Sequence, residues 1–411
     1  MKLSLLLSGA LFALTGSASA IKIDLRYEFD DNAFFEQPGS KEAMRAVADF
    51  YESLLQDNLL RIDQADWPSG NVWGARPRHP ATGNIVEIPN LIVPEDTIIV
   101  YAGGRDLGGP AGRGGPGGYS SGGSGAWFDL LDARGQDDYF QNPTADFGPW
   151  GGSIAFDTER SWNFSLTSTN EPGTPFVSIA LHEMGHLLGI GTALSWNDRI
   201  VNGEFVGSHS SAVFGSAVPL TSTGGHWRDD GRCEFPDGYD PTEPNNVLSK
   251  AFGSFGAPHG FGQIVLMDPG TCIVGDFHKV MTDLDLAGLR DIGWEVQPPL
   301  EWLQADVNPS TGPFAFAWNS TSGLTYRVEK STTLTGTWET LTTIPGDGTM
   351  KDYTAAVPAD TAAFYRLSTN PLPAAPAISA IGSPNRKGHS PSSREPVSVE
   401  GCECGKAWAD H

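Results

Sequence analysis

The sequence predicts an α+β domain followed by a small all-β sandwich, and two patterns along its 411 residues predict this organisation. Residues 21–296 alternate short β-rich apolar runs with stretches in which apolar residues recur at helical spacing. Residues 300–369 contain short β-rich runs separated by glycine, threonine and proline turns, which is typical of a small antiparallel sandwich. The chain is long enough for both units.

The N-terminal segment has the features of a cleaved secretory signal. Residues 1–20 contain Lys2, an apolar run over residues 3–14, and small residues that end in Ala20. We therefore expect a secreted protein, extracellular or periplasmic, whose mature chain begins near Ile21. An uncleaved anchor is the alternative, but the run is short for a membrane span. No other segment approaches the roughly 20 apolar residues that a transmembrane helix needs, so no transmembrane segment is expected.

The composition is acidic, with 49 Asp and Glu against 26 Lys and Arg and a formal net charge of −23. Such a chain repels phosphate backbones, so we do not expect nucleic acid as a partner. The 4 cysteines are too few for a disulfide-built scaffold of this size. Residues 370–411 are rich in proline and serine, include Cys402 and Cys404, and are expected to form a disordered tail.

The first elements of the α+β domain follow from local patterns. Residues 21–29 (IKIDLRYEF) predict a strand, and Ser40 is the expected N-cap of an amphipathic helix that ends near residue 55. Residues 96–104 (DTIIVYAGG) predict a buried strand.

A glycine-rich stretch, Gly103–Gly125, comes next. Its glycines match no phosphate-binding spacing, so we interpret it as a mobile surface loop. Residues 151–157 (GGSIAFD) then predict a further strand.

The helix that follows carries the candidate chemistry, in the stretch LHEMGHLLGIGT that begins at Leu181. Thr174 is the expected cap and Pro175 fits the first turn, so residues 176–188 are predicted to be helical until Gly189 ends the helix.

Within this helix His182 and His186 lie four residues apart, on one face, and can bind the same ion. A zinc ion held by neutral imidazoles lowers the pKa of its bound water to about 7. Glu183 lies beside that face and can take the proton as the water attacks a carbonyl. An HExxH match also occurs by chance in buried helices. The expected cap, the apolar residues on the other faces and Gly189 favour a zinc site.

At Gly189 the sequence resembles the metzincin proteases, whose longer pattern is HExxHxxGxxH. Their third histidine would stand at the place of Thr192, and a neutral hydroxyl is a poor zinc ligand. A third ligand must therefore come from elsewhere. The candidates that follow in the chain are His209, His226, His259 and His278.

The order of later motifs resembles the leishmanolysin-like branch of the metzincins and its bacterial relatives. The helix ends in LGIGT, and an insertion, GGHW, a methionine-containing turn and a helix that closes on DIGW follow. The resemblance implies one zinc ion per chain, with His226 as the displaced third ligand and His259 as its rival. It also implies that Met267 forms the turn beneath the metal without binding it, with Met281 as the alternative.

Three further expectations concern segments around these motifs. Cys233 and Cys272 could form a disulfide that joins the insertion to the floor of the site. An acidic run over residues 229–240 could bind calcium, but it has no recognisable ligand spacing and we interpret it as a solvated loop. A metzincin-like fold implies that residues 151–157 form the edge strand that pairs with an extended peptide substrate. An ordinary inner strand is the alternative.

The sandwich at residues 300–369 resembles the fibronectin-type-III-like modules of many bacterial exoenzymes, which implies binding to a cell surface or polymer. The leading hypothesis is a secreted zinc endopeptidase that hydrolyses peptide bonds of proteins or peptides, with Glu183 as the base. One alternative is a catalytically inactive surface-binding or adhesion protein with the same fold. Another is a thermolysin-like site with a glutamate ligand, for which the stretch around Glu204 is a poor candidate.

Overall fold

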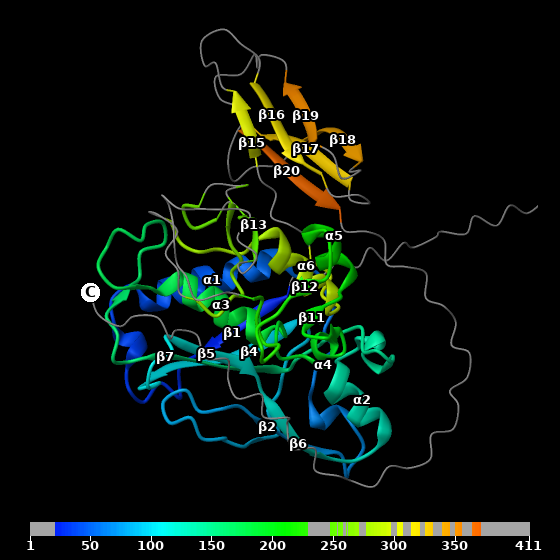
Figure 1. The fold of residues 1–411 in the computed structure, drawn as a ribbon. Coiled ribbons are helices and arrows are strands. Elements are labelled where there is room, and N and C mark those ends of the chain that lie inside the picture. Colours follow the sequence, from blue (N-terminus) through cyan, green and yellow to red (C-terminus); the bar gives the residue numbers. More distant parts are fainter. Residues whose placement is uncertain are drawn as a thin grey trace, which may run out of the picture.

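The computed structural model describes residues 21–228, 247–252, 254–257, 260, 262–270, 277–296, 302–306, 314–320, 325–331, 339–345, 350–355 and 364–370. These residues form a mixed α/β structure with several sheets and few helices (Figure 1). Several predictions concern residues outside these ranges: the signal segment, nearly all of the tail, the acidic run, His259, Cys233 and Cys272.

A four-stranded sheet forms the framework of the N-terminal part. Its strands, in spatial order, are β1 (Lys22–Arg26), β4 (Thr97–Arg105), β7 (Gly151–Asp157) and β5 (Gly112–Pro116). The first three run parallel, and β5 lies antiparallel to β7 at the edge. Alternate side chains of β4 enter two cores, Ile98 and Val100 on one face and Ile99 and Tyr101 on the other.

The expectation of an edge strand at residues 151–157 is wrong, because β7 lies between β4 and β5. The edge is β5, inside the stretch Gly103–Gly125 that we interpreted as a mobile loop. That interpretation is also wrong, since the stretch contains the end of β4, all of β5 and also β6 (Gly118–Gly122).

Close packing explains some of these glycines. A Cβ at Gly104 would lie 2.5 Å from Cβ of Phe34, and a Cβ at Gly117 would lie 2.1 Å from Cζ2 of Trp150. Composition alone does not distinguish a flexible backbone from one that must approach its neighbours closely.

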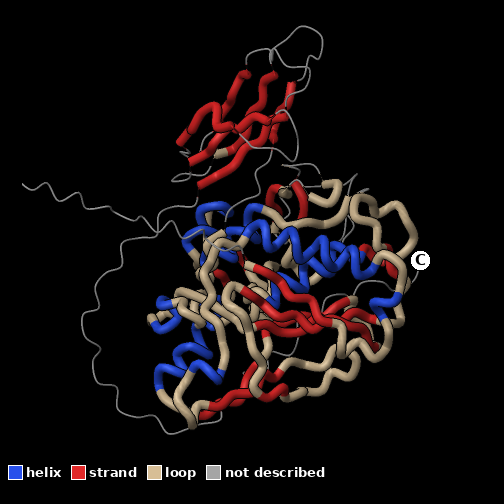
Figure 2. Tube along the Cα trace, turned by 180° about the vertical axis from the view of Figure 1, so that it is seen from behind, coloured by secondary structure: helices blue, strands red, loops and turns tan. Residues whose placement is uncertain are grey.

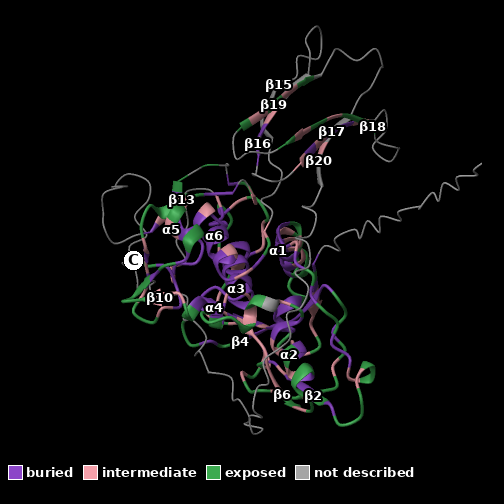
Figure 3. Cartoon of the chain, turned by 90° about the vertical axis from the view of Figure 1, so that its right-hand side faces the viewer, coloured by how far each residue is buried: buried purple, intermediate pink, exposed green. Residues whose placement is uncertain are grey.

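Helices α1 (Ser40–Leu54) and α3 (Phe176–Leu187) pack together in the core on one face of the sheet (Figure 2). Every residue of α3 is buried, so this helix is enclosed along its whole length (Figure 3). The second core, on the other face, includes Trp127 from α2 (Gly125–Ala133) and Trp73 from β2 (Val72–Arg76). β2 pairs with β6 and with β3 (Ile88–Pro89).

Both predicted helix caps are wrong by one residue. Ser40 is the first residue of α1, and the N-cap is Gly39, whose φ of 85° is open to glycine. The Ser40 hydroxyl donates to the carbonyl of Gln37 instead. The N-cap of α3 is Pro175, with no side-chain hydrogen bond at the cap, and Thr174 lies one residue earlier in the short strand β9 (Thr174–Pro175), which pairs with β8 (Trp162–Asn163).

The chain beyond α3 forms a series of short elements. They are α4 (Leu194–Asn197), β10 (Ile200–Val201), β11 (Glu204–Phe205), α5 (Ser208–Phe214), β12 (Val218–Pro219), β13 (Leu248–Lys250), β14 (Gly262–Ile264) and α6 (Asp283–Asp291). Helix α6 confirms the helix predicted before DIGW. Three 3-10 helices complete the described helices: η1 (Phe34–Glu36), η2 (Gln64–Asp66) and η3 (Asp137–Phe140).

The C-terminal strands form two three-stranded antiparallel sheets. One contains β15 (Trp302–Asp306), β16 (Phe314–Asn319) and β19 (Met350–Ala355), and the other β18 (Glu339–Pro345), β17 (Thr325–Ser331) and β20 (Phe364–Asn370). Trp318, Tyr326 and Val328 form their buried cluster. The strands occur where the sequence predicts them, while the fibronectin-type-III-like arrangement stays a prediction. Among the described helices, none is long and apolar enough to cross a membrane.

Candidate metal centre

Helix α3 positions the first two candidate ligands. His182 and His186 are one helical turn apart and are buried, with 3% and 0% of their surface exposed. Nδ1 of His182 lies 2.8 Å from the carbonyl oxygen of Leu266, and Nδ1 of His186 lies 2.8 Å from that of Ile190. A carbonyl can only accept, so each Nδ1 carries the proton and each Nε2 presents a lone pair.

A tight turn brings the third histidine to the same place. The Gly224 amide donates to the carbonyl of Thr221, and the Thr221 amide donates to the carbonyl of His226. A Cβ at Gly191, where φ is 76°, would lie 2.0 Å from the carbonyl oxygen of Gly225. The loop after α3 therefore touches the loop before His226 backbone to backbone, which only glycine permits.

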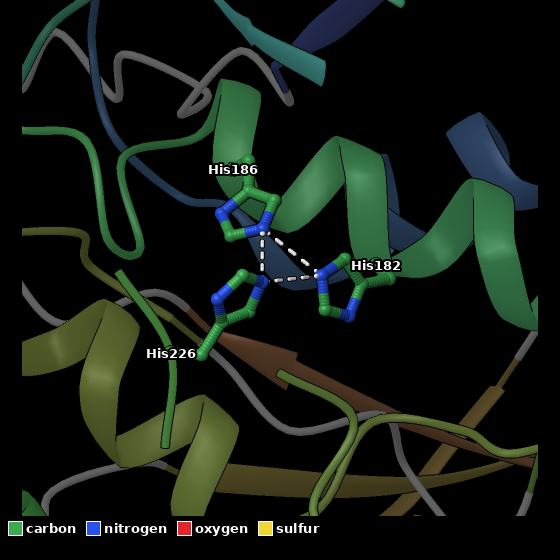
Figure 4. A group of neighbouring side chains, drawn as sticks. All are labelled: His182, His186 and His226. Carbon is green, nitrogen blue, oxygen red and sulfur yellow. Dashed lines mark hydrogen bonds between the residues drawn. The ribbon is translucent and has the colours of Figure 1, made fainter. Parts of the chain in front are cut away.

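The three Nε2 atoms converge on one point (Figure 4). Nε2 of His182 lies 2.9 Å from that of His186 and 3.2 Å from that of His226, and the remaining pair is 3.1 Å apart. The structure thus brings together the three histidines that the sequence analysis grouped as ligands. His226 lies 40 residues beyond His186 and 44 residues beyond His182 along the chain.

Burial keeps these imidazoles neutral. Desolvation lowers the pKa of His186 to about 4, against the opposing effect of its bond to Ile190. Desolvation also lowers the pKa of His182 and His226 well below the usual value, and electrostatic repulsion from His186 when it is protonated and from Lys279 lowers both further. At neutral pH all three are therefore uncharged and available as metal ligands.

This donor set fits a zinc ion. Zinc binds histidine nitrogen at about 2.0–2.1 Å, so two nitrogens of a tetrahedral site stand roughly 3.3 Å apart. The observed separations of 2.9 to 3.2 Å are slightly shorter. Three lone pairs directed at one point repel one another, and a shared cation removes that repulsion. Three imidazoles also leave the fourth position of a tetrahedral ion open, as catalytic zinc sites do.

Glu183 is fully buried beside these ligands and lies directly against the edge strand β5. A Cβ at Gly112 would lie 2.7 Å from both Cγ and Oε1 of Glu183, and a Cβ at Gly114 would lie 2.3 Å from its carbonyl oxygen. Gly115, in contrast, has no atom within 4 Å of the Cβ position. Because Gly112 and Gly114 have no side chain, the edge strand β5 can pack directly against α3.

We expect Gly114→Ala to lower the free energy of unfolding by about 1–3 kcal/mol, because the added methyl group meets a backbone oxygen that cannot rotate away. Gly115→Ala is the matched control. It adds the same methyl group to the same strand, at a position where no atom lies within 4 Å of the new Cβ. Denaturant unfolding of both variants measures the difference, and equal stability would show that β5 does not pack on α3 in this way.

The two methionines singled out in the sequence are both buried. Met267 packs against the backbone of α3 between the two histidines, since a Cβ at Gly185 would lie 2.5 Å from its Sδ. Its carbonyl accepts from the Trp227 amide at 3.1 Å. Met281 instead precedes α6, and its carbonyl accepts from the amide of Phe252. This placement favours Met267 over Met281 as the residue beneath the centre.

The other candidate ligands that the structure describes lie apart from the cluster. The Thr192 hydroxyl donates to the carbonyl of His186 at 2.6 Å, so it supports a ligand's backbone. His209 is exposed, and Nε2 of His278 lies 2.8 Å from the carbonyl oxygen of Ser165. A thermolysin-like site requires a glutamate on a second helix. Glu204 is exposed and lies on the two-residue strand β11 instead.

Sequence reasoning missed the residues that hold the ligands, of which Asp285 is the chief example. Its carboxylate accepts from the Trp227 indole at 3.0 Å and from the Leu266 amide at 2.9 Å. A signal existed: Thr282 followed three residues later by Asp285 is a capping pattern, and the structure contains that capping box.

Together, the buried three-histidine centre and the helix that carries it suggest a zinc metalloprotease. One comparison with known proteins agrees: 40 residues, 10% of this chain, are 48% identical to part of matrix metalloproteinase-2 of Drosophila melanogaster. The match covers only 5% of that protein. No protein-family model and no solved structure matches the chain.

Proposed function

We propose that the protein is a secreted zinc endopeptidase of the metzincin type, in which His182, His186 and His226 hold the ion and Glu183 is the general base. The convergence of three buried Nε2 atoms beside a glutamate carries this proposal. The resemblance of the motif order to the leishmanolysin-like branch supports His226, and the short similarity to a matrix metalloproteinase supports the protease class. Secretion rests on the signal-like residues 1–20.

Each residue has a defined task in peptide hydrolysis. A bound zinc ion supplies a water of lowered pKa and polarises the substrate carbonyl. The carboxylate of Glu183 takes a proton from the attacking water and delivers it to the leaving amine. The carbonyls of Leu266 and Ile190 hold the rings of His182 and His186 in the tautomer whose Nε2 lone pair can bind a metal ion.

An extended peptide is the substrate that suits the edge of the sheet. β5 pairs with β7 on one side, and no described strand pairs with its other side. Main-chain N–H and C=O groups on that side can bind a peptide as an added strand next to Glu183. This transfers to β5 the substrate-binding role that the sequence analysis assigned to residues 151–157.

The alternative is an inactive protein that binds a surface or polymer through its C-terminal strands. The presence of Glu183 at the histidine cluster favours the enzyme, because a decayed protease can lose its base and keep its fold. The C-terminal strands suit an accessory binding role in either case.

The purified protein is expected to contain about one zinc ion per chain and to cleave an unfolded protein such as casein. Zinc is measured by elemental analysis and cleavage by release of soluble peptides, before and after dialysis against a chelator. Chelation should abolish cleavage, and added zinc should restore it. A protein that binds zinc without cleaving casein or any tested peptide would support the inactive alternative.

A further inference from the structure

One buried carboxylate connects the separate segments that carry the candidate ligands. Asp285, in the first turn of α6, is 0% exposed. Its Oδ1 accepts from the indole Nε1 of Trp227 at 3.0 Å and from the amide of Met267 at 3.1 Å. Its Oδ2 accepts from the amide of Leu266 at 2.9 Å and from the amide and hydroxyl of Thr282 at 2.9 and 2.7 Å.

The first connection leads to His182 through a single peptide unit. The peptide between Leu266 and Met267 donates its N–H to Asp285 and accepts the Nδ1 proton of His182 with its carbonyl, at 2.8 Å. A carboxylate that accepts a hydrogen bond from the N–H polarises this peptide and makes its carbonyl a better acceptor. Asp285 therefore acts on the orientation of His182 without touching it.

The second connection leads to His226. Trp227 is the next residue in the chain, is fully buried, and packs on Trp196 with ring centroids 4.8 Å apart. Its indole donates to Asp285, and its amide donates to the carbonyl of Met267 at 3.1 Å. These two bonds hold the backbone at His226 against the turn that also binds His182.

We propose that Asp285 is a positioning residue that sets two of the three metal-binding histidines, His182 through the Leu266–Met267 peptide and His226 through Trp227. The inference rests on the proposed metal site. Closing a helix cap explains only the bonds to Thr282. The other three donors come from Trp227 and from the turn at Leu266–Met267, and they are the ones that reach the ligands.

Two substitutions test the proposal. Asp285→Asn keeps the size of the side chain, but whichever way the amide is turned, its NH₂ faces at least two donors. Trp227→Phe keeps an aromatic ring in the core but removes the indole donor together with part of the indole's volume, so it tests the connection to His226 if Asp285→Asn fails to fold. We expect each to weaken zinc binding about 10–100-fold.

Two control variants separate positioning from general stability. Thr282→Val removes the capping hydroxyl and leaves the donors from Trp227 and the 266–267 turn in place. Trp127→Phe removes another buried indole bond, to the carbonyl of Val72, in the second core. Both should unfold at lower temperature without metal, yet bind zinc as the wild type does.

The measurements are zinc affinity, by competition with a chromophoric chelator, and the visible absorption of the cobalt-substituted protein, which reports ligand geometry. Thermal unfolding of the metal-free proteins gives the stability of each variant. The proposal is overturned if Asp285→Asn or Trp227→Phe folds, binds zinc as tightly as Thr282→Val and gives the wild-type cobalt spectrum. A wild-type protein that binds neither metal would overturn the zinc site itself, and the proposal with it.

Discussion

Glu183→Gln is expected to keep its zinc and to lose about 10²–10⁴-fold in turnover of casein or of a short peptide. The substitution removes the proton acceptor and none of the three imidazoles. Glutamine has nearly the same shape as glutamate, which is important because the side chain is fully buried against Gly112 of β5. The measurements are zinc content, kcat with a fluorogenic peptide, and thermal unfolding.

Glu183→Ala serves as the second variant in this experiment. It should also retain zinc and lose activity, but its smaller side chain leaves a cavity and should lower the unfolding temperature. Loss of activity in both variants, with intact zinc and a folded Gln variant, isolates the chemical role from the packing role. Equal cleavage by Glu183→Gln and the wild type would exclude Glu183 as the base.

His226→Ala is expected to weaken zinc binding by more than the 10–100-fold that loss of an outer-shell partner costs, because it removes one of three direct ligands. Activity should fall with the lost metal. Zinc affinity is measured by chelator competition, and excess zinc tests whether activity can be partly restored.

His209→Ala is the matched control, since His209 is an exposed histidine from the same region of the chain. It should bind zinc as the wild type does. His259→Ala belongs in the same series because His259 is the rival third ligand. If His259→Ala empties the site while His226→Ala leaves it filled, the assignment of His226 is wrong, although a zinc protease with another ligand would remain.

Local sequence patterns predicted much of the framework and part of the site. The helix around His182 and His186 occurs at Phe176–Leu187 against a predicted range of 176–188. The parallel strands β1, β4 and β7 also occur where apolar runs predict them. These patterns depend on neighbours a few residues apart, which is the range over which periodicity and capping act.

The errors have a common cause in contacts between distant segments. Strand β5 was missed because GRGGP has no apolar alternation, and two of its glycines, Gly112 and Gly114, are explained only by their contact with Glu183 on the helix α3. Thr174 suits a helix cap by type, but the cap falls on Pro175, and Thr174 pairs with Trp162 in a short strand.

The sequence by itself determined that two histidines share a helical face beside Glu183, since four residues advance a helix by about one turn wherever that helix packs. It also pointed to His226, although only through resemblance to a family. Tertiary structure alone decided where the third imidazole lies, which strand forms the edge of the sheet, and that Asp285 joins Trp227 to the Leu266–Met267 turn. Residues 40 or more positions apart meet only when the core closes around them, and no local spacing encodes that distance.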